Sequence, residues 1–576
     1  MGLVAGLTHP VLWHSSRQAS HMGNFTEYQF WLMSTRFRNW YTADWDYGLT
    51  SVYFFCGAIF VFALINVLSI QRSSNVKAGS KGQADNLGDK ITGLSRYISS
   101  RQYHISIFDW YSPPLGHMLI VGAMFVFFMV LTFAVRPYYW PIPAMGNSPP
   151  LGTRAGWISI ALMPFVFAFS SKVNLIGLLT GTPHEKLQVF HRWTAWIMYI
   201  TSLVHTFPFI RFNVGIGKME LYYRTKSYYW TGVAALIPQT WLILMSWGPI
   251  RNRYYETFKK IHFLASIIFM IFLFIHCNFR LTSWDYFWAT GAVYGVTWLA
   301  RFGRALFQNG LGHTATFEAL PDRMVRVRIP TKTLNWAPGQ SYFVRFLDLG
   351  VHALTSHPFT VTSLPSSSVL EFHVRVREGT TARLASFAES GKTSAVMLDG
   401  PYGGVHGSLG AYDRVVLLAG GSGVSFTVPL LLDLLKGLAE KRVRTKHIHF
   451  LWAVPRAESL SCYSDLLNSA LKDAPEGTVT VSLYVTRTSR PLSPSSESSA
   501  NAEESKPASK TRMERPNLRE FVRAACAAGG TVGVATCGPD SFSLDVRNAV
   551  AGCELDIVRG RSSCTDVFLH TEAYSW

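Results

Sequence analysis

The sequence predicts an α-helical membrane bundle of about seven spans, followed by an antiparallel β-barrel and then an α/β domain. Three observations carry this prediction. Charge-free apolar stretches recur up to about residue 300, and most are long enough to cross a bilayer. Residues 312–400 then alternate in short runs broken by Pro and Gly, which is typical of antiparallel strands. From Arg414 an apolar strand, a Gly-rich turn and a helical segment follow one another, as in α/β units.

The composition favours a membrane protein. Of the 576 residues, 48% are hydrophobic and only 15% are charged, which is low for a soluble protein. The formal net charge is +18, but the basic residues are spread over loops beside apolar spans. A lipid bilayer is therefore the better partner and nucleic acid is not expected. Seven cysteines form no CxxC pair and four follow residue 500, which favours a reduced, cytosolic C-terminal half.

The chain is expected to begin outside the cell or in a lumen. Asn24 starts a glycosylation sequon, which is usable only on that side. No cleavable signal peptide is visible, so the first span is expected to be an uncleaved anchor. The seven predicted spans are Ser51–Ile70, Gly116–Val135, Ala155–Ser171, Trp193–Ile210, Ser227–Ile250, Ile261–Phe279 and Tyr286–Ala300.

The Lys and Arg residues of the loops predict the orientation. With the amino end outside, the inner loops 71–115, 172–188 and 249–260 hold twelve basic residues and the outer loops hold seven. The excess on the inner side supports this orientation. The outer loop 211–227, with four basic residues, opposes it, and is interpreted either as lipid-headgroup anchoring or as a basic mouth for anionic metal chelates.

Two of the predicted spans carry a pair of histidines at one repeated spacing. His191 and His205 are fourteen residues apart, as are His262 and His276. On an α-helix this spacing places both imidazoles on one face, roughly 21 Å apart along the axis. One span separates the two helices, so they run in the same direction and His191 pairs with His262, and His205 with His276. Ionisable side chains inside a membrane are usually functional, and two facing pairs could each hold a haem iron axially.

A set of short motifs follows in the C-terminal half. The turn Gly420-Gly421-Ser422-Gly423 leaves an apolar strand and enters a helix, where a pyrophosphate could meet backbone N–H groups. This turn alone is weak evidence, because it is not a GxGxxG. Other motifs in the same half of the chain strengthen the interpretation of this turn as a nucleotide-binding site. In chain order they are Ala337–Gln340, His357–Thr360, Gly400–Gly403, Cys537–Pro539 and the C-terminal Glu572–Trp576.

With these motifs, the C-terminal half resembles the ferredoxin–NADP reductase superfamily. From about residue 45 the chain resembles the fungal ferric-chelate reductases, the metalloreductase branch of a superfamily that also contains the NADPH oxidases. The stretch LTGTPHEKLQVFHRW leading into His191, the motif SHPFTVTSLP and the terminal aromatic pair carry this resemblance. The implied domains are an N-terminal segment at 1–49, a haem-binding membrane domain at 50–308, an FAD-binding β-barrel at 309–408 and an NADPH-binding α/β domain at 409–576. A disordered insertion is expected at about 488–515.

The resemblance also implies roles for individual residues. Arg456 is expected to meet the 2′-phosphate of NADPH, because a guanidinium suits that dianion. Tyr574 or Trp576 is expected to cover the flavin ring, and Thr360, Cys537, Tyr574 and Trp576 are the expected catalytic residues. FAD is expected to contact His357, Pro358, Phe359, Thr360, Arg375, Gly379 and Thr381, and NADPH to contact Gly420, Gly421, Ser422, Gly423, Arg456, Cys537, Gly538 and Pro539.

The function implied is electron transfer from cytosolic NADPH through FAD and two b-type haems to ferric chelates or siderophores outside, for metal uptake. Cupric ions are a second candidate substrate. The plasma membrane is the expected location, with an organelle membrane as the alternative, and an iron permease or multicopper oxidase is a candidate downstream partner.

Two other functions are open to the same sequence. An NADPH oxidase that reduces oxygen to superoxide would share most motifs, although such oxidases usually shorten the second histidine gap by one residue and have six spans. A transporter with a fused nucleotide-binding domain would explain the spans, but not four histidines in register or the flavin motifs.

Overall fold

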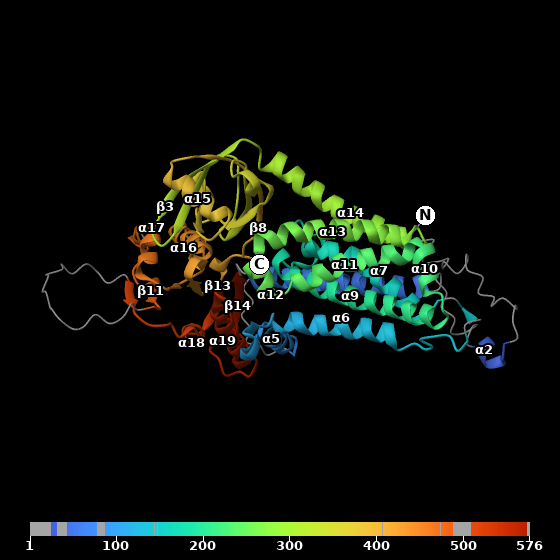
Figure 1. Cartoon of the computed structure of the whole chain (residues 1–576). Coiled ribbons are helices and arrows are strands. Elements are labelled where there is room, and N and C mark those ends of the chain that lie inside the picture. Colours follow the sequence, from blue (N-terminus) through green and yellow to red (C-terminus); the bar gives the residue numbers. More distant parts are fainter. Residues whose placement is uncertain are drawn as a thin grey trace. The chain divides into compact units, whose positions relative to one another are not determined.

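The computed structural model describes residues 25–31, 43–77, 87–142, 145–146, 148–405, 407–472, 474–487 and 509–572. Tyr574 and Trp576, the sequon residue Asn24 and most of the expected insertion (488–508) lie outside the described residues. The chain divides into two compact units (Figure 1). The helical unit comprises Met1–Arg72 and Leu119–Ala300, and the sheet unit comprises Ser73–Met118 and Arg301–Trp576.

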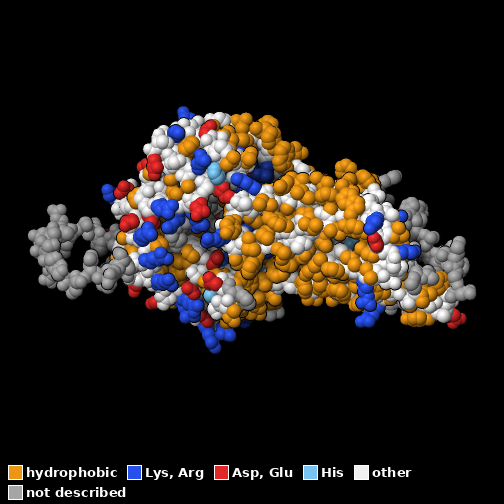
Figure 2. All heavy atoms as spheres, viewed as in Figure 1, with side chains coloured by type: hydrophobic (Ala, Val, Ile, Leu, Met, Phe, Trp, Pro, Cys, Tyr) orange, Lys and Arg blue, Asp and Glu red, His pale blue; other side chains and the backbone are white. Residues whose placement is uncertain are grey.

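Long helices dominate the helical unit, and hydrophobic side chains cover much of its visible surface (Figure 2). Exposed apolar residues such as Ile65, Leu119 and Ile267 contribute to this cover, as expected for helices that face lipid. The helices of this part of the chain are α2 (Glu27–Trp31), η3 (Asp44–Leu49), α4 (Thr50–Lys77), α6 (Leu115–Phe133), α7 (Pro150–Ser170), α8 (Leu175–Thr180), α9 (His184–Gly215), α10 (Met219–Thr225), α11 (Ser227–Met245), α12 (Gly248–Arg253), α13 (Tyr255–Cys277) and α14 (Ser283–Gly303).

Five helical segments among the described residues are long and apolar enough to cross a membrane. Four of them correspond to predicted spans, namely Asp44–Ile70, Leu115–Phe133, Pro150–Ser170 and Tyr255–Cys277. The fifth, Gly421–Ala439, contributes to the core of the sheet unit instead. The chain therefore has a helical transmembrane region, while the count of seven spans stays a prediction.

Helix α7 forms the centre of the helical unit. Most of its residues are buried, including the whole Arg154 side chain. Arg154 donates from Nη2 to the carbonyl of Val135 at 2.7 Å, and its guanidinium lies 5.5 Å from the centre of the Tyr47 ring. The sequence analysis placed Arg154 in an outer loop, but α7 begins earlier than predicted, at Pro150, because proline suits the first turn of a helix.

The first half of the sheet unit contains a six-stranded sheet whose neighbouring strands are all antiparallel. Buried apolar residues alternate with charged ones along β4, where Val325, Val327 and Ile329 face the core. Helix α15 (Thr380–Glu389) follows β7 in the chain. Closure of this sheet into a barrel stays a prediction. In spatial order the strands are β6 (His357–Thr360), β5 (Gln340–Phe346), β8 (Ser394–Gly403), β3 (His313–Leu320), β4 (Met324–Pro330) and β7 (Val369–Arg375).

The second sheet is six-stranded and its neighbouring strands are all parallel, as the sequence predicts. Its helices are α16 (Val424–Ala439), α17 (Ser461–Lys472), α18 (Leu518–Ala527) and α19 (Asp540–Val558). In spatial order its strands are β12 (Ser509–Arg512), β11 (Val479–Val485), β10 (His447–Val454), β9 (Arg414–Gly420), β13 (Gly530–Cys537) and β14 (Cys564–Glu572).

A helix that the sequence analysis did not predict belongs to the sheet unit. Within the inner loop 71–115 the structure has α5 (Leu87–Ser100) and a small hairpin, β1 (His104–Ile105) with β2 (Trp110–Tyr111). Helix α5 lies beside α19 (Figure 1). Arg96 of α5 contacts Asp566 at 2.8 Å and the buried Glu554 at 3.5 Å. Burial raises the pKa of the Glu554 carboxyl to about 7.

Candidate functional site

The four predicted histidines lie on two helices of the helical unit. His191 and His205 belong to α9, and His262 and His276 to α13. The ring centres of His205 and His276 are 6.0 Å apart, and the two ring planes are close to perpendicular at 86°. His191 and His262 lie on the same two helices, fourteen residues before His205 and His276. The structure thus places His205 beside His276, while the pairing of His191 with His262 stays a prediction.

Backbone carbonyls orient three of the four imidazoles. Nδ1 of His191 lies 2.9 Å from the Val166 oxygen and Nδ1 of His205 lies 2.8 Å from the Gly152 oxygen, both on α7. A carbonyl can only accept, so Nδ1–H is the donor in each pair and Nε2 keeps its lone pair free.

The other helix repeats this arrangement in part. Nδ1–H of His276 donates to the carbonyl oxygen of Tyr228 on α11 at 2.7 Å. Nδ1 of His262 is buried without a hydrogen-bond partner. Three imidazoles are therefore held with Nε2 available as a metal ligand, an orientation common in metalloproteins.

Two glycines that the sequence analysis missed give the imidazoles access to these carbonyls. A Cβ on Gly156 would lie 2.5 Å from Nδ1 of His205, and one on Gly232 would lie 2.9 Å from Nδ1 of His276. Each glycine stands four residues after the accepting residue, Gly152 or Tyr228, and so one helical turn above the carbonyl. A glycine in a membrane helix has many explanations, so spacing alone could not single these two out.

The arrangement can supply two nitrogen ligands at each of two positions. Within the described part of the chain, no group of three or more His, Cys, Asp or Glu side chains could hold a metal ion. Sites of bare zinc or iron with three or four protein ligands are therefore not formed by these residues. A metal that arrives with its own equatorial ligands needs only the two axial positions that a histidine pair provides.

In the sheet unit, the expected flavin residues lie on β6 and around the start of α15. His357, Pro358, Phe359 and Thr360 form β6. Nε2 of His357 lies 3.0 Å from the hydroxyl of Thr380, the first residue of α15. Gly379, which precedes α15, has a φ of 69°, a conformation that glycine adopts without strain.

The other expected flavin residues lie nearby in the chain. The hydroxyl of Thr381 accepts from the backbone N–H of Arg377 at 2.8 Å and so fixes the turn before α15. The Phe359 ring packs towards Phe346 and Phe372 at centroid distances of 6.4 and 6.2 Å, so it contributes to the core of the antiparallel sheet.

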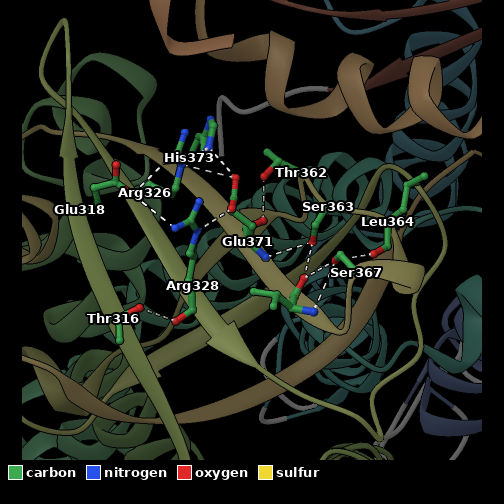
Figure 3. Close-up of polar contacts among 11 residues, drawn as sticks. Thr316, Glu318, Arg326, Arg328, Thr362, Ser363, Leu364, Ser367, Glu371 and His373 are labelled. Carbon is green, nitrogen blue, oxygen red and sulfur yellow. Dashed lines mark hydrogen bonds and ion pairs between the residues drawn. The ribbon is translucent and has the colours of Figure 1, made fainter. Parts of the chain in front are cut away.

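A charged network stiffens the strand that ends at Arg375 (Figure 3). Glu371 on β7 lies at its centre. Arg328 donates from Nε to one Glu371 oxygen at 2.9 Å, and Nε2 of His373 lies 2.9 Å from the other. Burial raises the pKa of Glu371, but the hydrogen bonds from His373 and Arg328 outweigh burial and hold the pKa at about 2. The carboxylate thus stays ionised and ties β4 to β7.

The two expected nucleotide motifs come into direct contact. They meet because β9 and β13 are neighbouring parallel strands, with Cys537 opposite Ala419. A Cβ on Gly423 would lie 2.1 Å from the carbonyl oxygen of Cys537, and one on Gly420 would lie 2.8 Å from Pro539. Helices α16 and α19 both begin at this edge of the sheet, so their N–H groups are available to an anion. The Cys537 side chain itself is buried.

A pocket beside this turn is lined from both halves of the sheet unit. Arg375 and Asp322 come from the antiparallel half, while Gly421 and Ser422 come from the turn. Arg456 follows β10 and is paired with Asp322, with 3.4 Å between Nη1 and the carboxylate. Asp322 also accepts a hydrogen bond from the hydroxyl of Ser459. The sequence analysis missed Asp322, because it lies in an ordinary turn between β3 and β4.

Three family models match the chain in order. Residues 155–273 match the ferric reductase-like transmembrane component, residues 311–406 an FAD-binding domain, and residues 412–551 the ferric reductase NAD-binding domain. Each match falls within the part of the structure that carries the corresponding histidines or motifs. The chain therefore carries a transmembrane region of this type, followed by FAD- and NAD-binding domains.

Two curated relatives of the chain come from fungi. The chain is 33% identical over 399 residues to a probable cell surface ferric reductase, kap2, of Aspergillus oryzae, an alignment that covers 65% of this chain and 52% of the relative. It is 29% identical over 416 residues to ferric/cupric reductase transmembrane component 7 of Saccharomyces cerevisiae, covering 69% of this chain and 65% of the relative. The chain thus spans about half to two thirds of the length of these relatives.

Glu371→Gln tests the network on β7. The folded pKa of Glu371 lies below its unfolded value, so the carboxylate stabilises the fold above about pH 4.5, and this contribution is lost as the pH falls towards 2. In the variant, the free energy of unfolding should fall by about 2–3 kcal/mol. On heating, flavin fluorescence should then rise at a lower temperature than in the unmodified protein. The deficit should be constant from pH 7 to 5 and shrink below 4.5. Glu389→Gln, at an exposed position on α15, is the control, and an equal loss in both variants would contradict the assignment.

Proposed function

We propose that this chain, a member of the ferric reductase family, is a transmembrane oxidoreductase that takes electrons from NADPH on one side of a membrane and delivers them to ferric chelates on the other. The observation that carries this proposal is the pair of imidazoles at His205 and His276, which face each other at 6.0 Å between two apolar helices. A second pair, His191 and His262, belongs to the same two helices. A bundle that only transported a solute would have no use for two such pairs in register.

The residues present fit two haem groups. Imidazoles bound end-on to one metal through bonds of about 2 Å place their ring centres roughly 6 Å apart, close to the distance between His205 and His276. The carbonyls of Gly152, Val166 and Tyr228 hold the Nδ1–H of three ligands, which leaves Nε2 for iron. We therefore assign His191/His262 and His205/His276 as axial ligand pairs of two b-type haems.

When bound, the haem groups supply one-electron carriers across the bilayer, and FAD supplies the exchange between hydride and single electrons. The protein would hold these cofactors in position. Helices α9 and α13 would hold the two histidine pairs roughly 21 Å apart along the helix axis. With a histidine pair holding each haem iron, an external acceptor would be reduced without binding to the iron.

The sheet unit would bind the two nucleotides. His357, Thr360 and the start of α15 would hold FAD, with Arg375 towards its pyrophosphate. The Gly420–Gly423 turn and Cys537–Pro539 would hold NADPH, because both present backbone N–H groups at the same sheet edge. One hydride carries two electrons, so each NADPH would reduce two ferric ions and yield NADP⁺ and a proton.

The substrate and location are proposed from the relatives and the loops. One relative is named as a probable cell surface ferric reductase and the other as a ferric/cupric reductase. We therefore propose ferric chelates or siderophores as substrates, cupric ions as a second substrate and the plasma membrane as the location, with the amino end outside. A permease or a multicopper oxidase would use the metal downstream.

NADPH-driven reduction of a ferric chelate in membranes containing the full chain tests the proposal. Activity that superoxide dismutase does not change, together with a reduced-minus-oxidised spectrum of b-type haem, is the expected result. Iron reduction that dismutase abolishes would show that oxygen is the acceptor and would replace the proposal with an NADPH oxidase.

His205→Leu tests the electron path. The variant should lose the spectral contribution of one haem and nearly all reduction of external ferric chelates, because the His205/His276 pair has lost a ligand. NADPH-driven flavin reduction should survive, since it takes place in the sheet unit. Normal chelate reduction by this variant would show that the electrons do not pass this pair.

Gly156→Ala and Gly232→Ala test the placement of the His205 and His276 imidazoles. Each added methyl would meet Nδ1 of a histidine at 2.5 or 2.9 Å, and should displace the ring from its carbonyl. One haem should be lost or shifted in potential, measured by haem content and a redox titration without any substrate. Gly291→Ala is the control, because its Cβ would meet nothing within 4 Å. Unchanged spectra in all three variants would refute the placement.

Arg456→Gln tests nucleotide selection. Loss of a charged hydrogen bond to the 2′-phosphate costs about 1.5–3 kcal/mol, so the KM for NADPH should rise about 10- to 100-fold. The KM for NADH should change little. Arg444→Gln is the matched control, because Arg444 is equally exposed and also paired with an aspartate, Asp413. Equal rises in KM for both nucleotides would remove Arg456 from the 2′-phosphate site.

A further inference from the structure

Helix α5 exposes the face that a surface helix normally buries. Ile91, Leu94 and Ile98 are 59, 44 and 37% exposed. At 100° per residue these three side chains fall within about 60° of one another, so they form one apolar stripe. In soluble proteins such a stripe faces the core.

The opposite face of α5 contacts the sheet unit. Gly93 is buried, and a Cβ there would lie 2.5 Å from Val558 on α19. Arg96 reaches Glu554 and Asp566. Gly93 and Arg96 lie roughly 130–170° around the helix from the middle of the stripe. The helix therefore has two contact faces, and α19 occupies only the polar one.

The end of α5 is fixed beside the beginning of a membrane span. The backbone N–H of Leu115, the first residue of α6, donates to the carbonyl of Arg101 at 2.8 Å. A Cβ on Gly116 would lie 2.8 Å from that of Ser99. Helix α6 has 19 residues and is thus about 28 Å long, only just enough to cross the hydrocarbon layer. Its first residue must therefore lie at the membrane surface, and the end of α5 with it.

The segment between α5 and α6 has the same character. Ile105, Ile107 and Trp110 of the hairpin are exposed. Residues 71–115 contain six Lys and Arg against three Asp and no Glu, a positive excess that suits the anionic lipids of the cytosolic leaflet. Apolar residues on one helix face together with basic neighbours are the features of helices that lie in the interface.

We propose that α5 is an interfacial adaptor, with its Ile91–Leu94–Ile98 stripe inserted among the lipid headgroups and its Gly93–Arg96 face bound to α19. The occupant of the stripe is the leaflet from which α4 and α6 emerge. The nucleotide-binding sheet is then attached to the bilayer through α19 as well as through its chain connections. This proposal requires only that the chain spans a membrane, and is independent of the electron acceptor.

The test is photo-cross-linking of the full chain in nanodiscs that contain phosphatidylserine and a tagged lipid. A benzoylphenylalanine replaces Leu94 in one variant and Ile91 in a second, so that a folding defect in one does not decide the result. Leu466, a 37% exposed leucine on α17 of the same unit, is the matched control. Bound FAD verifies that each variant is folded.

Lipid labelling from positions 94 and 91 should exceed that from position 466 at least about 5-fold, and should fall when neutral lipid replaces phosphatidylserine. Labelling equal to the control, or cross-links from position 94 to another segment of the chain, would overturn the proposal. Because neither NADPH nor a metal chelate is present, a negative result here leaves the proposed reductase activity untouched, and a loss of that activity leaves the lipid contact untouched.

Discussion

The hydrogen bond from an imidazole Nδ1–H to a helix carbonyl is the interaction on which the membrane site depends. It fixes the tautomer, the direction of Nε2 and the rotation of the ring in one contact. A helix carbonyl inside a bilayer accepts one hydrogen bond from the N–H group four residues later in the chain. Its second lone pair is therefore free to accept the Nδ1–H of an imidazole. The path of α7 beside α9 and the glycine at position 156 allow carbonyl and imidazole to come together.

Much of the architecture could be predicted because it follows from composition and period. The apolar stretches, the alternation along the antiparallel strands and the turn at Gly420 each report a local physical requirement. The pairing of His205 with His276 could also be predicted, because it needs only the helical period and the direction of two spans. Except for that pairing, these features depend on residues that are near one another in the chain.

The remainder depends on contacts between distant segments, which periodicity does not report. Gly232 is distinguished from Gly291 by the imidazole of His276 beside it, and Asp322 is distinguished by its contacts with Arg456 and Ser459. The sequence predicts a loop where α5 lies, since the apolar stripe of this helix is short and its opposite face holds glycine and serine. Arg154 was placed outside the membrane because a charged residue normally marks the end of a span, whereas a cation that donates to a carbonyl and lies over an aromatic ring can be accommodated inside.

The two carbonyls of α7 that serve α9 are themselves fourteen residues apart, at positions 152 and 166, and they meet His205 and His191 in antiparallel order. Helices α7, α9 and α13 thus each carry two contact groups at the same spacing of fourteen residues. One residue inserted within that interval would turn everything beyond it by 100° and take one carbonyl or one imidazole away from its partner. In this chain, side chains inside the interval can therefore be replaced more readily than residues can be inserted or deleted there, because a change of length must be compensated on the facing helices.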